Sequence, residues 1–150
     1  MTKIQKTKRD QALSAALLKL QRCHFSRTKT REVLLTFLIE EHGPFSIEEI
    51  HRGLKRQEMD LVTIYRCMQA FEKADVARRC DFGDGIARFE FQGEDGHHHH
   101  VICKECKKTD NLGDCELPAL EIKAKRLGYS KIKHTLEFFG VCKDCFDRTS

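Results

Sequence analysis

Two Cys-x-x-Cys pairs constrain the C-terminal third of this chain more than any other feature. The first pair is Cys103 and Cys106, the second is Cys142 and Cys145, and 35 residues lie between them. A tight turn lets both sulfurs of such a pair converge on one metal ion, and four thiolates in a tetrahedron favour a closed, structural zinc site. A [4Fe–4S] cluster or redox pairs are alternatives, but the strand–helix–strand context of a thioredoxin-like motif is absent. The spacing therefore predicts a zinc ion that fastens a strand to the C-terminus of a small domain.

Four consecutive histidines, His97 to His100, end three residues before the first pair. A purification tag would lie at a terminus, and this run lies two-thirds of the way along the chain. Side chains alternate between the faces of a strand, so His97 and His99 would point to one side and His98 and His100 to the other. The run predicts two histidine pairs that suit zinc, iron(II), manganese or nickel, each with further ligands from elsewhere. An exposed polar strand without metal is the alternative.

The other four cysteines indicate less. Cys67 lies on an apolar helical stripe and is expected in the core, and Cys23 is expected to bind no metal. Cys80, on a predicted hairpin, and Cys115, beside two acidic residues, are weaker candidate ligands. No apolar run approaches the ~18 residues of a membrane span and no signal peptide is evident. We therefore expect a cytoplasmic protein, in which eight cysteines serve metal binding rather than disulfides.

Positive charge is concentrated at the start of the chain. Residues 1–31 carry nine Lys or Arg against one acid, whereas residues 93–150 carry ten of each sign. A basic end on a neutral body indicates a polyanionic partner, DNA or RNA rather than a membrane. A solvated basic tail is the alternative.

Hydrophobic periodicity predicts four helices and then a hairpin in the first half of the chain. Residues 13–20 form the first helix, and residues 28–43 the second, with Leu34, Phe37 and Leu38 inward and Gly43 as its stop. The capping box "SIEE" at residues 46–49 opens a third, with Ile47, Ile50, His51 and Leu54 along one side. Asp60 caps a fourth helix, whose inward residues are Ile64, Cys67, Met68 and Phe71. Residues 76–91 then alternate as a hairpin with its turn at residues 83–85.

This order predicts a winged helix-turn-helix in which the fourth helix recognises DNA. Its outer face carries Thr63, Arg66 and Gln69, with Tyr65 on the flank, which are residue types that suit phosphate and base-edge contacts. After residues 92–96 the pattern changes to a strand at 97–103, a helix at 116–127 and one or two strands within 129–142. These elements predict a second, αβ domain.

Together these motifs resemble the ferric uptake regulator (Fur) family of bacterial metal-responsive repressors, which includes iron, zinc and peroxide sensors. The resemblance runs from about residue 10 to residue 145 and is carried by "LVTIYRCMQAFEKADV", "RFEF", "HHHHVICKEC" and "HTLEFFGVCKDC". It implies an α+β fold with a winged-helix DNA-binding domain at 1–91, a hinge at 92–96 and a metal-binding dimerisation domain at 97–150. It also implies a homodimer that binds an operator in double-stranded DNA and has no enzymatic activity.

The resemblance also implies roles for individual residues. The structural zinc would be held by Cys103, Cys106, Cys142 and Cys145. The regulatory divalent metal would be held by Glu90, His98 and His100, and a second site by His97, His99, His134 and a helix carboxylate, for which we take Glu116. The expected DNA contacts are Arg27, Arg31, Thr63, Tyr65, Arg66 and Gln69.

The chain departs from the family pattern where iron and peroxide sensors have a histidine before the "S-x-E-E" helix, because Pro44 stands there. His42, Cys80 or Asp81 would then supply the remaining ligand from the first domain or hinge. Asn111 also replaces an acid of many members. We expect zinc as the signal, with an iron- or peroxide-responsive regulator as the alternative. A third interpretation is a nucleic-acid-binding module that zinc stabilises structurally and that does not respond to a change in metal concentration. Neither HExxH nor the zinc-deaminase pattern occurs, which disfavours a zinc enzyme.

Overall fold

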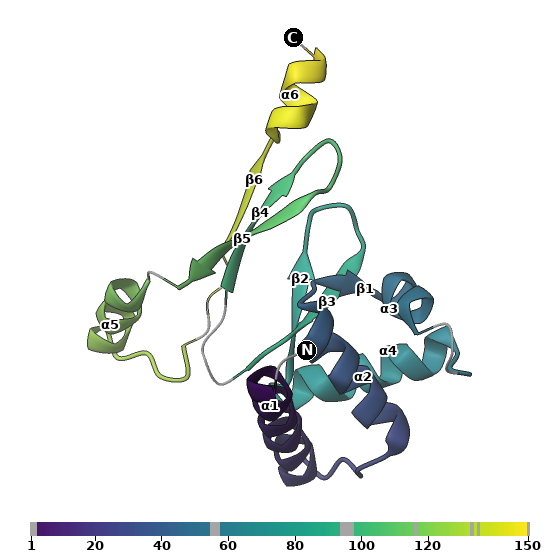
Figure 1. Cartoon of the computed structure of the whole chain (residues 1–150). Helices are drawn as coiled ribbons and strands as arrows, with labels where there is room; N and C mark the ends of the chain where they lie inside the picture. The colour runs from purple at the N-terminus through teal and green to yellow at the C-terminus, as the bar shows by residue number, and fades with distance from the viewer. Residues whose placement is uncertain are drawn as a thin grey trace. The chain divides into compact units, whose positions relative to one another are not determined.

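The chain forms two units, Met1–Glu94 and Asp95–Ser150, in a computed structural model of the protein (Figure 1). The structure describes residues 3–54, 58–93, 98–115, 117–132, 134 and 136–149. Within these ranges, no helix has both the length and the apolar character needed to cross a membrane.

Four helices build most of the first unit, and three of them begin at a side-chain cap. They are α1 (Lys3–Arg22), α2 (Lys29–Glu41), α3 (Ile47–Gly53) and α4 (Leu61–Lys73). Thr28 caps α2 and Asp60 caps α4, each side chain accepting a hydrogen bond from a first-turn amide. Ser46 and Glu49 form the predicted capping box of α3, with each side chain accepting from the other residue's backbone N–H. These caps satisfy amides that have no partner inside their own helix.

The core of the first unit lies where α1, α2, α3 and α4 meet the sheet. The inward positions expected on α4 are all buried, and Phe71 and Met68 are fully so. The largest fully buried side chains of this core are Leu20, Leu34, Leu35, Leu38, Ile50, Ile64, Met68, Phe71, Val76 and Phe89. The periodicity therefore identified the packed face of α4 correctly.

Three details of the helices differ from the sequence prediction. The second helix ends at His42 instead of Gly43, because His42 itself adopts the left-handed conformation with φ of 54°. His51 is exposed and does not share the inward face of α3 with the buried Ile50. On α2, Leu35 and Ile39 are buried, while Phe37 is only half-buried.

A three-stranded sheet completes the first unit. Strands β2 (Ala77–Asp81) and β3 (Ala87–Phe91) form the predicted hairpin, and the two-residue strand β1 (Phe45–Ser46), which the sequence did not predict, pairs with the other side of β3. The turn contains two glycines with positive φ, 71° at Gly83 and 76° at Gly85. Asp84 lies between these two glycines, and hydrogen bonds from Arg88 lower its pKa to about 2.

The second unit contains three strands and two short helices. Its sheet has the order β5-β4-β6, in which β4 (His98–Cys103) pairs antiparallel with β5 (Thr109–Asp114) and parallel with β6 (Glu137–Gly140). Helix α5 (Pro118–Arg126) lies on the crossover between β5 and β6, and α6 (Lys143–Thr149) follows β6 at the C-terminal end (Figure 1). The expected helix begins at Pro118, two residues later than predicted, with the proline in its first turn. Strand β5 and helix α6 were not predicted.

Few apolar side chains of the second unit are buried. Among its described residues, the buried hydrophobic positions are Ile102, Cys103 and Cys145. Large exposed hydrophobic residues are instead common here, and they are Leu112, Leu120, Ile122, Leu127, Tyr129, Phe138, Phe139, Val141 and Phe146. A core this small needs additional stabilisation from metal binding or from association with another chain.

Candidate metal centres and nucleic-acid surface

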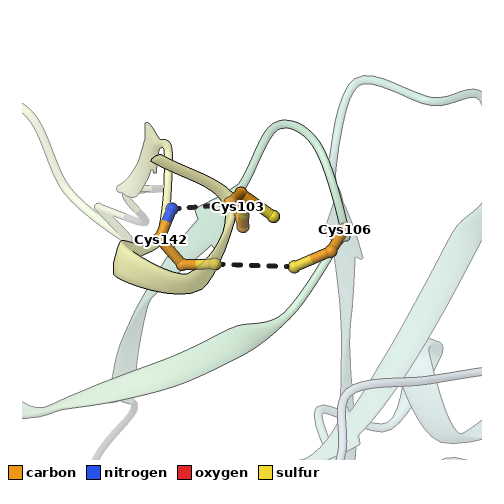
Figure 2. Close-up of side chains that lie close together, drawn as sticks. Cys103, Cys106 and Cys142 are labelled. Atoms are coloured by element: carbon orange, nitrogen blue, oxygen red, sulfur yellow. Dashed lines mark hydrogen bonds between the residues drawn. The ribbon is translucent and has the colours of Figure 1, made fainter. Parts of the chain in front are cut away.

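The two Cys-x-x-Cys pairs converge on one point of the second unit. Cys103 ends β4, Cys106 lies in the turn that follows, and Cys142 immediately precedes α6 (Figure 2). Cys145 lies in the first turn of α6. The four sulfurs lie within 4.8 Å of one another, and the Sγ atoms of Cys106 and Cys142 are 3.7 Å apart. Four sulfurs at about 2.3 Å from zinc in a tetrahedron would be about 3.8 Å apart. The donor set and its spacing therefore fit a tetrathiolate zinc ion.

Backbone amides prepare one of these cysteines to be a thiolate. The Cys142 N–H lies 3.3 Å from the Cys103 sulfur and donates a hydrogen bond to it. This bond, with those from the amides of Cys106 and Glu105, lowers the pKa of Cys103 to about 6. Burial and the neighbouring thiols act oppositely on Cys145 and raise its pKa to about 12. Metal binding must therefore displace a proton from Cys145, which makes metal affinity at this site dependent on pH.

A second group of metal donors lies in the same unit, around His99 of β4. Its ring Nε2 is 3.4 Å from Nε2 of His134, and the Cys115 sulfur is 3.3 Å from the same His134 nitrogen. The side chain of His99 is buried, and those of Cys115 and His134 are half-buried. Two imidazole nitrogens bound to one tetrahedral zinc would be about 3.3 Å apart.

Hydrogen bonds to the outer nitrogens fix the tautomers of both histidines. Nδ1 of His99 is 3.0 Å from the Leu136 carbonyl oxygen, and Nδ1 of His134 is 3.1 Å from a Glu121 carboxylate oxygen. Both oxygens only accept, so each Nδ1 donates its proton and each Nε2 presents a lone pair to the same point. Carbonyl and carboxylate partners of this kind orient histidines that bind metals. The arrangement of His99, His134 and Cys115 therefore suits a metal with nitrogen and sulfur ligands.

The structure places the expected ligands of this second site unevenly. His99 and His134 lie together as the resemblance implied, but His97 and Glu116 fall outside the described residues. The sequence made Cys115 only a weak candidate. It implied a helix carboxylate near His134 and took Glu116 for it, whereas the structure places Glu121 of α5 against His134. Neither the contact between Cys115 and His134 nor that between Glu121 and His134 could be predicted from neighbouring residues in the sequence. Both depend on how the segment before β6 brings His134 back to β4.

The hinge-side candidates in the first unit lie on one face of its sheet. The register pairs Arg78 with Glu90 and Cys80 with Arg88, so Cys80 and Glu90 point to the same side. The Cys80 sulfur and a Glu90 carboxylate oxygen lie within 4.8 Å of each other. Arg78 donates from Nε to Oε1 of Glu90 at 2.9 Å, which compensates the carboxylate charge. These two strands thus present a thiol and a carboxylate as neighbouring donors.

The other hinge-side candidates are placed as follows. Asp81 accepts a hydrogen bond from the Gly83 amide at 2.8 Å, which assigns it to the hairpin turn. His42 is exposed at the end of α2. In the second unit, His98 and His100 lie on β4 with one residue between them. The pairing with β5 is irregular here, and the extra residue of this bulge lies on β5, near Gly113, whose φ is 85°. The alternation along β4 is therefore preserved.

The outer face of α4 is open to solvent in the way that a recognition helix requires. Arg66 and Gln69 are exposed, Tyr65 is 46% exposed, and Thr63 is half-buried. Arg27 is also exposed and pairs with Glu32. Arg31 differs from expectation, because it is half-buried, donates to the Ser26 carbonyl and lies over the Phe25 ring. Its geometry is that of a side chain that packs the loop before α2.

Comparisons with known proteins agree on one family. The model of the "Ferric uptake regulator family" matches residues 24–139. A peroxide-responsive repressor, PerR, of Staphylococcus saprophyticus is 30% identical over 124 residues, which cover 81% of this chain and 82% of the relative. The ferric uptake regulator structure of Vibrio cholerae is 26% identical, with a TM-score of 0.66, over 82% of this chain and 96% of that one. That of Helicobacter pylori has a TM-score of 0.73 at 22% identity, over 92% and 93%.

A winged-helix unit joined to a small αβ unit rich in metal donors defines the class of metal-responsive DNA-binding regulators. The chain belongs to the ferric uptake regulator family.

Proposed function

We propose that this protein is a metal-dependent transcriptional repressor whose DNA affinity is controlled by zinc. The match of the family model to residues 24–139, which include both α4 and the histidine run, carries this conclusion. The repressor function named for the Staphylococcus saprophyticus relative, 30% identical to this chain, supports it.

DNA recognition is assigned to the first unit. Helix α4 would enter the major groove with Tyr65, Arg66 and Gln69 toward the bases and backbone, since these side chains lie opposite its buried stripe. Arg27 and Lys29 at the start of α2 would contact phosphates, which predicts a steep loss of affinity with added salt. Arg31 is left out of the phosphate contacts because it faces Phe25.

We propose that two copies associate through the second unit. Strand β6 is at the edge of its sheet, and Phe138 and Phe139 on it are 48% and 42% exposed. An exposed apolar edge strand pairs readily with another chain. A dimer would present two α4 helices to two half-sites of an operator. Replacement of both phenylalanines by aspartate should give a monomer in sedimentation; a dimer that survived would exclude this interface.

Two metals in the second unit would be structural. A zinc ion on Cys103, Cys106, Cys142 and Cys145 would hold the end of β4 to the start of α6. A second ion on His99, His134 and Cys115 would hold β4 to the segments on either side of α5. Among the described residues, neither group of donors includes a carboxylate, and thiolate with imidazole favours zinc over harder ions.

The regulatory metal would take ligands from both units: Cys80 and Glu90 from the first, His98 and His100 from the second. Metal would replace Arg78 as the charge partner of Glu90. A thiolate in this set favours zinc over iron(II) or manganese. Ligation would fix the spacing of the two α4 helices in the dimer, so metal and DNA would stabilise the same shape. Such coupling amounts to about 1–3 kcal/mol, or roughly 5- to 150-fold in affinity.

The test is DNA affinity as a function of buffered free metal, with protein that retains only its tightly bound zinc. An inverted-repeat, A/T-rich duplex is the probe, and a scrambled duplex is the control. Zinc should raise affinity tenfold or more in wild type and in Cys23→Ser, but not in Cys80→Ser or Glu90→Ala. An equal response in Glu90→Ala would contradict the proposed site.

The peroxide-responsive relative supports a competing assignment. If iron(II) alone raises DNA affinity, and hydrogen peroxide then abolishes it, the protein senses peroxide and zinc is not the signal. A response to neither metal would favour a nucleic-acid-binding module without a sensing role.

A further inference from the structure

The tetrathiolate site has a charged neighbour in its own C-terminal helix. Arg148 donates from Nη2 to the Cys145 sulfur at 3.0 Å, and from Nε to the Asp144 carbonyl oxygen at 3.0 Å. Cys145 itself is buried, with 4% of its surface exposed. The guanidinium therefore makes two directed hydrogen bonds, one to a metal donor and one to the backbone of the same helix.

Helix α6 connects these contacts to the geometry of the site. Its first turn forms on Cys142, whose carbonyl oxygen accepts from the amides of Cys145 at 3.1 Å and Phe146 at 2.9 Å. Cys145 and Arg148 are three residues apart, a spacing at which helical side chains are neighbours. The contact between Arg148 and Cys145 therefore follows from the helical conformation of α6. It links the last turn of the helix to a sulfur in its first turn.

Charge gives the contact a consequence for metal retention. A divalent zinc with four thiolates carries a net charge of −2, so a cation hydrogen-bonded to one sulfur offsets part of it. Hydrogen bonds in which a partner is ionised are among the stronger ones in proteins. Partners outside the ligand shell typically change metal affinity by roughly 10- to 100-fold.

We propose that Arg148 is a positioning residue for the structural zinc, which holds the Cys145 sulfur in place, offsets the charge of the tetrathiolate site and slows loss of the metal. This inference rests on the zinc site proposed above. Lysine is not equivalent at this position, because its single ammonium cannot make both planar hydrogen bonds.

The experiment measures zinc release from the zinc-loaded protein into excess chelator. Arg148→Gln should release zinc about tenfold faster than wild type, the lower end of the usual range because the guanidinium is exposed. Arg148→Lys keeps the charge and should lie between the two. Arg126→Gln, which removes an exposed arginine at the end of α5, is the matched control and should behave as wild type.

A spectroscopic readout separates this role from general stability. With cobalt(II) in place of zinc, the thiolate-to-cobalt charge-transfer band should move to longer wavelength in Arg148→Gln, because a sulfur without its hydrogen bond gives up electrons more easily. Wild-type release and an unshifted band in Arg148→Gln would overturn the inference. If Arg148→Gln does not fold, Arg148→Lys decides in the same way. Wild type that binds no zinc at the four cysteines would instead refute the zinc site itself.

Discussion

At the scale of single residues, the proposed metal site on His99, His134 and Cys115 would depend on Glu121 and the Leu136 carbonyl as much as on its ligands. Each accepts the Nδ1 proton of one histidine and so turns an Nε2 lone pair toward the shared point. Cys115 supplies the sulfur beside them and accepts a hydrogen bond from the Leu117 amide at 3.4 Å.

Cys115→Ser should therefore weaken metal binding at this site and leave the tetrathiolate site intact. We expect the stoichiometry of zinc bound per chain to fall by one after dialysis against a weak chelator, with affinity at this site reduced by more than tenfold. Cys23→Ser, which replaces an exposed cysteine of the first unit, should bind as wild type. Unchanged stoichiometry in Cys115→Ser would show that the sulfur is not a ligand.

The sequence predicted individual residues well only where spacing alone is informative. Cys-x-x-Cys places two sulfurs in one turn, so the four cysteines could be grouped from their positions in the chain. Strand alternation likewise separated His99 from its neighbours in the run. Spacing could not identify Cys115 or Glu121, because both contact His134, which is distant in the sequence. It could not identify Arg148 either, because the short helix α6 that places Arg148 beside Cys145 was not predicted.

At the scale of elements, the helices of the first unit could be predicted because each combines an apolar stripe with a cap. Strand β5, "TDNLGD", is the opposite case: it contains turn-forming residues and no alternation, and its conformation is imposed by pairing with β4. Helix α6 has only seven residues and begins between the two cysteines of the second Cys-x-x-Cys pair. A helix this short is marginal in isolation, so its conformation is stabilised by contacts with the rest of the unit more than by helix propensity.

The contact between α2 and α3 is tested at Gly53. A Cβ added there would lie 2.5 Å from Cε2 of Phe37, so the ring would have to move. We expect Gly53→Ala to lower the free energy of unfolding of the first unit by about 1–3 kcal/mol, as overpacking does. Urea denaturation measures this change.

Phe37→Leu in the same chain serves as the control for the Gly53 prediction. The smaller side chain should relieve the clash, so the double variant should be more stable than the sum of the two single changes predicts. Simple additivity would mean that Phe37 does not cause the loss.

At the scale of the whole molecule, the two units differ in what stabilises them. The first has a continuous core of its own, built from four helices and a sheet. The second buries little apolar surface and depends on metal ions and, as proposed, on a partner chain. This division suits a regulator, because the unit to which we assign DNA recognition has a core that does not depend on metal.

The central claim is that zinc and DNA stabilise the same conformation. Thermodynamic linkage requires the coupling to be reciprocal: if zinc tightens DNA binding by some factor, DNA must tighten zinc binding by the same factor. The most direct measurement is the zinc affinity of the regulatory site, in buffered zinc, with and without a saturating inverted-repeat duplex. We predict a rise of tenfold or more with that duplex and none with a scrambled one. Equal zinc affinity with and without the inverted-repeat duplex would contradict the account.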